Sequence, residues 1–242
     1  MTNTTYLIKN QIKRIGKDNL LLLLSVYPLI LAVTGRYLVP FLRSTFIEQI
    51  DLAIHYPTIL TFLILANPYI YGALAAFLLL DEREENVLQA IRVTPLSLNR
   101  YLLIKVAFFT GLSFVSGVFI TLIVGFLKMS LLDTILLNAL LALATPFNMI
   151  FINSFAKNRV EGFALVKGSG MLIVLPLAAF YIPSPYNVLV GILPGYWPAM
   201  AIRVMYEENF SQISYWGYAI MGTIYIVMLI KLLSHRFKKK VS

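Results

Sequence analysis

Two histidines, His55 and His235, are the residues of this chain best suited to metal binding or proton transfer. They lie far apart, and neither stands in the H-E-x-x-H pattern of a zinc protease. Residues 167–170 read KGSG, which is not the G-x-S-x-G elbow of a serine hydrolase. The chain also has no cysteine, so thiolate metal sites and disulfides are excluded. We therefore expect no metal, no bound cofactor and no enzymatic activity.

A different kind of chemistry is indicated by the densest charge cluster of the chain, the run DEREE at residues 81–85. It follows a long apolar segment and precedes a short amphipathic one, in which Val87, Leu88 and Ile91 form an apolar stripe. Acidic residues stabilise the N-terminus of a helix, so we expect them to begin a short helix along the membrane. That helix would be a docking surface. The alternative is a solvated connection whose charges only stop the membrane spans.

The end of this segment is marked by a Thr-Pro pair. Pro95 disfavours helical geometry at Thr94, and Ser97 is suited to cap the helix that follows.

The composition places these residues in a membrane protein. The 242 residues are 59% hydrophobic and 13% charged, with a mean hydropathy of +0.80, whereas soluble domains carry about 25% charged residues. A bilayer core requires about 20 apolar residues of helix. Six segments qualify, so we expect a single all-α transmembrane domain over residues 1–242. The segments are 19–38, 57–80, 101–127, 131–155, 162–183 and 215–233.

Two further segments complete the predicted architecture. Residues 184–212 include an apolar stretch broken by glycine and proline, and we expect an extracellular re-entrant or interfacial hairpin there, because loosened backbone must be buried or face water. Residues 1–18 carry Ile8, Ile12 and Ile15 among basic residues, which favours a helix in the membrane interface. The alternative is an ordinary basic flank. We expect the N-terminal segment to be retained, since it lacks the cleavage site of a signal peptide.

The distribution of positive charge predicts the orientation. If the N-terminus is cytoplasmic, sixteen of the 20 Lys and Arg residues fall on the cytoplasmic side. We therefore expect a protein of the plasma membrane with both termini in the cytoplasm. We also expect the net charge of +9 to contact membrane lipids rather than nucleic acid.

Several polar or helix-breaking residues lie within the predicted spans. A substrate-lining role is one interpretation, and interhelical hydrogen bonding is the one we favour. Span interiors are almost free of acidic residues, which weighs against a proton-coupled carrier. The candidates for the substrate path are Asn67, Pro68, Asn138, Pro146 and Asn148.

The segment DEREENVLQAIRVTPLSLNRYLLIKV, residues 81–106, resembles the one after the second span in type-2 ABC transporter permeases. That class contains prokaryotic drug, lipid and polysaccharide exporters. The shared elements are an acidic ERE at 82–84, a helix at 86–93, a TPLS turn at 94–97, and Tyr101 with Lys105 opening the next span.

The resemblance implies a coupling helix that sits in a cleft of a separate ATPase subunit. ATP and Mg²⁺ would bind to that subunit, since this chain lacks the G-x-x-x-x-G-K-[ST] loop. A second permease copy is also implied, identical or not. The loop at 157–161 would be a second contact. The residues expected at the coupling contact are Asp81, Glu82, Arg83, Glu84, Glu85, Gln89, Arg92, Thr94 and Pro95.

The expected function is export of a drug-like, lipid-like or peptide amphiphile. Two alternatives stay open: export of a cell-envelope polysaccharide or lipid-linked precursor, and an integral membrane subunit outside the ABC class.

Overall fold

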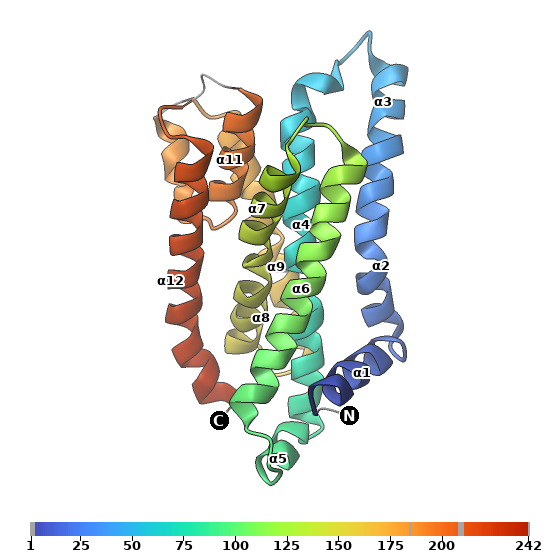
Figure 1. Cartoon of the computed structure of the whole chain (residues 1–242), viewed down its shortest axis with the longest axis vertical. Helices are drawn as coiled ribbons and strands as arrows, with labels where there is room; N and C mark the ends of the chain where they lie inside the picture. Colours follow the sequence, from blue (N-terminus) through green and yellow to red (C-terminus); the bar gives the residue numbers. More distant parts are fainter. Residues whose placement is uncertain (1–2, 184, 208–210, 242) are drawn as a thin grey trace.

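The computed structural model describes residues 3–183, 185–207 and 211–241, and all regular secondary structure in these ranges is helical. Within them, six segments are long and apolar enough to cross a membrane, which confirms the predicted all-α membrane architecture. The segments run alongside one another, and the two ends of the chain lie at the same end of the bundle, here called the terminal end (Figure 1). The six segments are Asn19–Phe46, Leu52–Glu84, Leu98–Val124, Leu131–Phe155, Arg159–Phe180 and Tyr215–Phe237.

The second span is the centre of the bundle. Its main helix, α4 (Tyr56–Glu84), is apolar on all sides over most of its length, as expected for a helix with no exposed face. In the apolar part of the second span 94% of the residues are buried, against 17% in the apolar part of the span Arg159–Phe180. α4 packs most extensively against α8 (Ala144–Phe155) and α6 (Leu98–Val124).

The contact between α4 and α8 depends on a glycine. A Cβ atom at Gly72 would lie 2.7 Å from the Cβ of Asn148 and 2.8 Å from the carbonyl oxygen of Thr145. Small residues allow the backbones of membrane helices to approach closely. The two helices therefore meet along a seam that no larger side chain at Gly72 could occupy.

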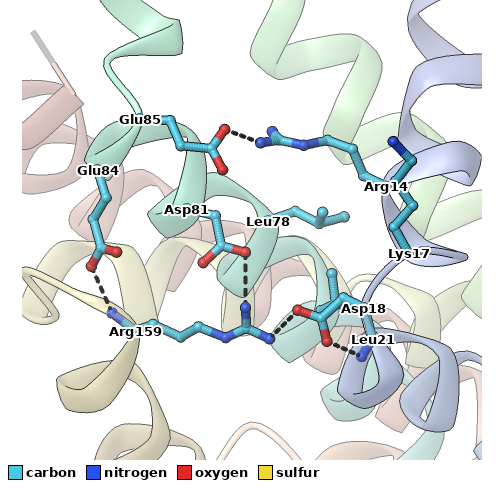
Figure 2. A pocket seen from close by; sticks show the side chains of 9 residues that line it. All are labelled: Arg14, Lys17, Asp18, Leu21, Leu78, Asp81, Glu84, Glu85 and Arg159. Atoms are coloured by element: carbon cyan, nitrogen blue, oxygen red, sulfur yellow. Dashed lines mark hydrogen bonds and ion pairs between the residues drawn. The ribbon is translucent and has the colours of Figure 1, made fainter.

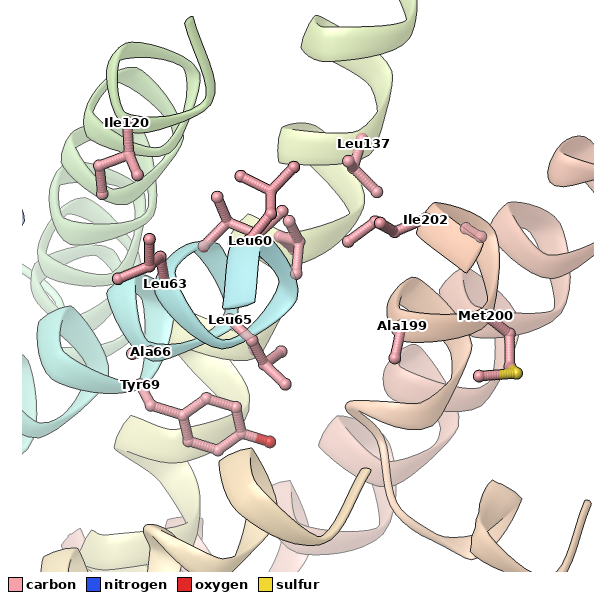
Figure 3. Close-up of a cluster of buried hydrophobic side chains, with 14 of the residues drawn as sticks. Leu60, Leu63, Leu65, Ala66, Tyr69, Ile120, Leu137, Ala199, Met200 and Ile202 are labelled. Atoms are coloured by element: carbon pink, nitrogen blue, oxygen red, sulfur yellow. The ribbon is translucent and has the colours of Figure 1, made fainter. Parts of the chain in front are cut away.

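Buried apolar side chains form two clusters along α4. In the cluster away from the terminal end, Leu60 and Leu63 of α4 lie with Leu137 of α7 (Leu131–Ala142) and Ile202 of α11 (Tyr196–Tyr206) (Figure 3). The second cluster surrounds the last three turns of α4 and includes Leu88, just beyond its end. The terminal end of α4 is thus held by packing as well as by charge.

Several spans are interrupted where the sequence disfavours a straight helix. The fourth is divided into α7 and α8 at Leu143, three residues before Pro146, whose ring crowds the preceding turn. The fifth is divided at Gly170 into α9 (Arg159–Ser169) and α10 (Met171–Leu177), followed by the 3-10 turn η3 (Ala178–Phe180).

The first span is longer than the predicted 19–38. It comprises α2 (Asn19–Val33), the π-helical turn η1 (Thr34–Leu38) and α3 (Val39–Phe46). Arg43 lies near its end, and its guanidinium binds Asp51 at 2.8 Å, directly before the 3-10 turn η2 (Leu52–His55).

The predicted hairpin corresponds to a 3-10 helix, η4 (Tyr186–Ile192), followed by α11, at the end of the bundle away from the termini (Figure 1). α11 is buried against α12 (Tyr215–Val241) and α4. Residues 184 and 208–210 of the predicted range lie outside the described residues. A re-entrant position in the membrane stays a prediction.

The N-terminal helix α1 (Asn3–Ile15) lies across the terminal end at an angle to α2 (Figure 1). Ile12 is 57% exposed, Lys9 and Lys13 are exposed, and Gln11 faces the bundle and is buried. An interfacial position for α1 also stays a prediction.

Candidate functional site

The acidic cluster lies at the C-terminus of α4 and not, as predicted, at the N-terminus of a new helix. Residues 81–84 form the last turn of α4. Asn86 then adopts a left-handed conformation, with φ of 58°, and α5 (Val87–Arg92) begins after it. Acidic residues are unfavourable at a helix C-terminus. They are stable here because three basic side chains from other helices, Arg14, Lys105 and Arg159, bind them.

Glu82 is the centre of the first group of contacts. Its carboxylate accepts a hydrogen bond from the Tyr101 hydroxyl at 2.6 Å and binds the Lys105 ammonium at 2.6 Å. The Arg14 guanidinium lies 3.2 Å away. Gln11 donates to the Tyr101 hydroxyl at 3.4 Å. These five residues, called here the Glu82 cluster, join α1, α4 and α6.

The centre of the Glu82 cluster is buried away from solvent, whereas Arg14 at its edge is 24% exposed. The side chains of Glu82 and Lys105 are 1% and 0% exposed. Two charges out of water are tolerated only when each has a close partner, and removal of one partner from such a pair typically costs about 3–5 kcal/mol. Burial disfavours the charged form of Arg14, but Glu82 and Glu85 together raise the pKa of its guanidinium above the usual value. Arg14 is therefore a permanent cation at the edge of the cluster.

A second group of contacts surrounds Arg159, the first residue of α9. Its guanidinium binds Asp18 at 2.7 Å and Asp81 at 3.3 Å, and its backbone N–H donates to the Glu84 carboxylate at 3.1 Å. These four residues, the Arg159 cluster, join the start of α2 and the end of α4 to α9. Exposures of 18–28% for the three ion-paired side chains make this cluster more accessible than the Glu82–Lys105 pair.

Asp18 has a second role as the N-terminal cap of α2. Its carboxylate accepts hydrogen bonds from the backbone N–H groups of Leu20 and Leu21 at 2.9 and 3.1 Å. Partial burial would raise the pKa of this carboxyl, but the Arg159 guanidinium and the two N–H groups hold it below its usual value. Asp18 is thus stabilised as an anion.

A cavity of about 290 Å³ lies between the two clusters (Figure 2). Its wall comes from the junction of α1 and α2, the end of α4 and the start of α9. The lining residues of this terminal cavity are Arg14, Lys17, Asp18, Leu21, Leu78, Asp81, Glu84, Glu85 and Arg159.

The helix α5 carries the most exposed surface of this region. Leu88 is buried beneath it, and Val87 and Ile91 are half-buried, as the apolar stripe predicted. Val93, directly after α5, is 87% exposed. Ser97 caps α6 as predicted, accepting from the N–H of Arg100 at 3.4 Å. The exposed residues, called here the α5 surface, are Gln89, Ala90, Arg92, Val93, Thr94 and Pro95.

The nine residues proposed for coupling are thus divided by burial. Glu82 is buried, Asp81 and Arg83 are half-buried, and Arg83 donates to the carbonyl of Ala156 at 3.4 Å. Glu84 and Glu85 are exposed at the rim of the terminal cavity. The remaining four, Gln89, Arg92, Thr94 and Pro95, belong to the α5 surface.

The loop at 157–161 lies close to the end of α4. Asn158 caps α9 by accepting from the N–H of Glu161 at 2.9 Å, and Arg159 contacts Glu84 and Asp81. Val160 is 78% exposed. The loop therefore presents an accessible surface next to the Arg159 cluster.

Three residues in the clusters, Arg14, Asp18 and Arg159, were not recognised as partners of the acidic cluster from the sequence. Lys105 was noted only as part of the resemblance. One signal was present: Tyr101 and Lys105 are four residues apart, so they are neighbours on one face of α6, about one turn apart.

The candidates for the substrate path lie inside the bundle. Asn67 donates to the Ser113 carbonyl at 2.8 Å, Asn138 to the Thr121 hydroxyl at 3.0 Å, and Asn148 to the Tyr69 carbonyl at 2.7 Å. Each bond joins two different helices. Pro68 and Pro146 are buried beside them.

The comparisons with known proteins identify the family of the chain. A family model described as "Fluoroquinolones export permease protein Rv2686c-like" matches residues 11–234, which include both clusters and the α5 surface. The chain belongs to this family. It is therefore a multi-pass membrane protein of a permease family, and the resemblance to a type-2 permease is confirmed at that level.

Two relatives carry the same description. They are the fluoroquinolones export permease proteins of Mycobacterium tuberculosis strains CDC 1551 / Oshkosh and ATCC 25618 / H37Rv. Each is 31% identical to this chain over 237 residues, covering 96% of this chain and 92% of the relative. No solved structure matches the chain.

Proposed function

We propose that this chain is the transmembrane subunit of an ATP-driven ABC exporter that moves fluoroquinolone-like amphiphiles out of the cytoplasm or the inner leaflet. The family and the names of its bacterial relatives support the drug class. The observation that carries the ATP-driven part is the α5 surface, because it exposes the TPLS-like segment next to a buried ionic cluster. The terminal end is then cytoplasmic, in keeping with the bias of Lys and Arg toward it.

In this proposal the α5 surface sits on a separate ATPase subunit, which binds ATP and Mg²⁺. The apolar side chain of Val93, 87% exposed, would be buried in that contact. A second permease copy would complete the pathway for the substrate.

Movement of the ATPase would reach the spans through α4. The Glu82 cluster fixes the end of α4 to α1 and α6, so a displacement of α5 moves these three helices together. The Arg159 cluster couples the end of α4 to α9 more weakly, because its ion pairs are partly exposed.

The proposal is tested by purification of the tagged chain in mild detergent from its own host. We expect a P-loop ATPase to co-purify stoichiometrically and to hydrolyse ATP. Val93→Glu should reduce the recovered ATPase at least tenfold, since a charge would be buried in the contact without disturbing the fold. Ile54→Glu, at a 73% exposed apolar position at the opposite end, is the matched control.

A folded wild-type preparation without an ATPase would contradict the proposal. Drug accumulation gives a second readout: cells that express Val93→Glu should retain more norfloxacin than cells that express Ile54→Glu. Equal norfloxacin accumulation in the two strains would show that drug export does not depend on the α5 surface.

A further inference from the structure

The terminal cavity differs in charge from the groove between α7 and α12 and from the groove beside η4. Four carboxylates and three basic groups surround its volume of about 290 Å³, with Leu21 and Leu78 as apolar wall. The grooves between α7 and α12 and beside η4 are lined almost entirely by apolar side chains, as expected for surfaces against lipid.

Most of the charges in the cavity wall are already paired. Arg14 binds Glu82 and Glu85, and Arg159 binds Asp18 and Asp81. These pairs hold the two ends of the wall in place.

Two opposite charges in the wall remain for a ligand. Among the residues that the structure describes, Lys17 makes no ion pair, and the Glu84 carboxylate accepts only the backbone N–H of Arg159. Lys17, in the turn between α1 and α2, and Glu84, at the end of α4, lie on opposite sides of the hollow (Figure 2). A molecule between them meets a cation on one side and an anion on the other.

We propose that the terminal cavity binds a zwitterion, with its anionic group against Lys17 and its ammonium group against Glu84. Ligand pockets for complete drug-sized molecules have volumes of about 300–1,000 Å³. A cavity of about 290 Å³ therefore holds a head group or the polar end of an amphiphile.

Two sources supply this chemistry. One is the phosphoethanolamine head group of a membrane lipid. The other is an exported drug with a carboxylate and an amine, and this source rests on the proposed function. Binding is measured on the permease alone, so a failure of ATPase association and a failure of the cavity proposal are separate results.

The test uses the full chain in nanodiscs of phosphatidylglycerol, which is not zwitterionic. Norfloxacin binding is followed by its own fluorescence anisotropy, and dihexanoyl phosphatidylethanolamine binding by native mass spectrometry. Lys17→Gln and Glu84→Gln are the test variants, both at exposed positions. Lys13→Gln and Glu48→Gln are matched controls at exposed positions outside the cavity.

We expect Lys17→Gln and Glu84→Gln each to weaken binding about three- to tenfold, the range for a partly solvated charged hydrogen bond. Weakened norfloxacin binding identifies a drug site, and weakened binding of the phospholipid identifies a lipid site. N-acetylnorfloxacin, which lacks the amine cation, should bind equally to wild type and Glu84→Gln. The proposal is overturned if both ligands bind the two variants and the controls within twofold of wild type.

Discussion

The Glu82 cluster and the Arg159 cluster bind the same last turn of α4, but one is buried and the other is half-exposed. Glu82 and Lys105 are at most 1% exposed, whereas the ion-paired side chains of the Arg159 cluster are 18–28% exposed. The buried pair has no water to replace a lost partner. Water can reach the ion pairs of the Arg159 cluster and replace a lost partner, so breaking them costs little free energy.

This difference predicts which helices move together. α1, α4 and α6 should behave as one unit at the terminal end, because separation would leave a charge unpaired in the interior. α9 and the start of α2 are joined to that unit by contacts that water can replace. We therefore expect the terminal cavity, which lies between the two clusters, to change its width when α4 moves.

The largest expected effect comes from Lys105→Met. It leaves the Glu82 carboxylate buried with one cation fewer, and the expected loss of unfolding free energy is about 3–5 kcal/mol. The loss is measured by thermal unfolding in detergent, with size-exclusion chromatography used to monitor the folded fraction. Lys128→Met, at an exposed position, should unfold like wild type. A Lys105→Met variant as stable as wild type would remove the distinction between the clusters.

The double variant Glu82→Gln/Lys105→Met should be more stable than Lys105→Met alone. It removes the buried anion together with its cation, and replacement of a complete buried pair is often close to neutral. The same unfolding assay measures the recovery. If the two substitutions were simply additive, the pair would not be coupled as the 2.6 Å contact indicates.

Arg159→Gln should cost less, about 1 kcal/mol, because its ion pairs are partly solvated. The difference between this variant and wild type should shrink as NaCl is raised from 0.05 to about 0.5 M, where the screening length falls well below 10 Å. The stability difference for Lys105→Met should change little over that range. An equal salt response of both variants would contradict the contrast in burial.

The smallest effect is expected for Asp18→Asn, which keeps a good helix cap and removes only the charge. The folded-state pKa of Asp18 lies below its ordinary value of 3.8. Its charge therefore stabilises the protein fully above that value, and the contribution is lost as pH falls through the folded-state pKa. The difference between Asp18→Asn and wild type should be constant between about pH 5 and 7 and should shrink as pH falls below the ordinary value of 3.8 and through the folded-state pKa. A difference that does not change with pH would assign it to the cap.

Much of the fold was predictable because apolar runs of helical length are a strong signal. The six spans, the cap at Ser97 and the apolar stripe of α5 were all predicted from local pattern. The break before Pro146 follows from the geometry of proline. The extension of the first span to Phe46 was not predicted, because the partner that accommodates Arg43 is Asp51, beyond the helix.

The partners of the acidic cluster were less predictable. Arg14, Lys105 and Arg159 come from three helices far apart in sequence. Lys105 was noted in the resemblance and Arg159 in the loop at 157–161, but none of the three was paired with the acidic cluster. The number of Lys and Arg residues in each loop predicts on which side of the membrane the loop lies, but not which acidic residue each of them binds. The helix to which residues 81–84 belong was also predicted wrongly, since their favourable position at an N-terminus was outweighed by long-range ion pairs.

The central position of α4 has a consequence for biogenesis. It leaves the ribosome before α6, α8 and α11, the helices that enclose it. Until α6 arrives, Asn67 has neither the Ser113 carbonyl nor the Ser116 hydroxyl that it binds in the folded protein. The insertion machinery must therefore keep α4 away from bulk lipid, or accept its exposed amide, until the third span has been inserted.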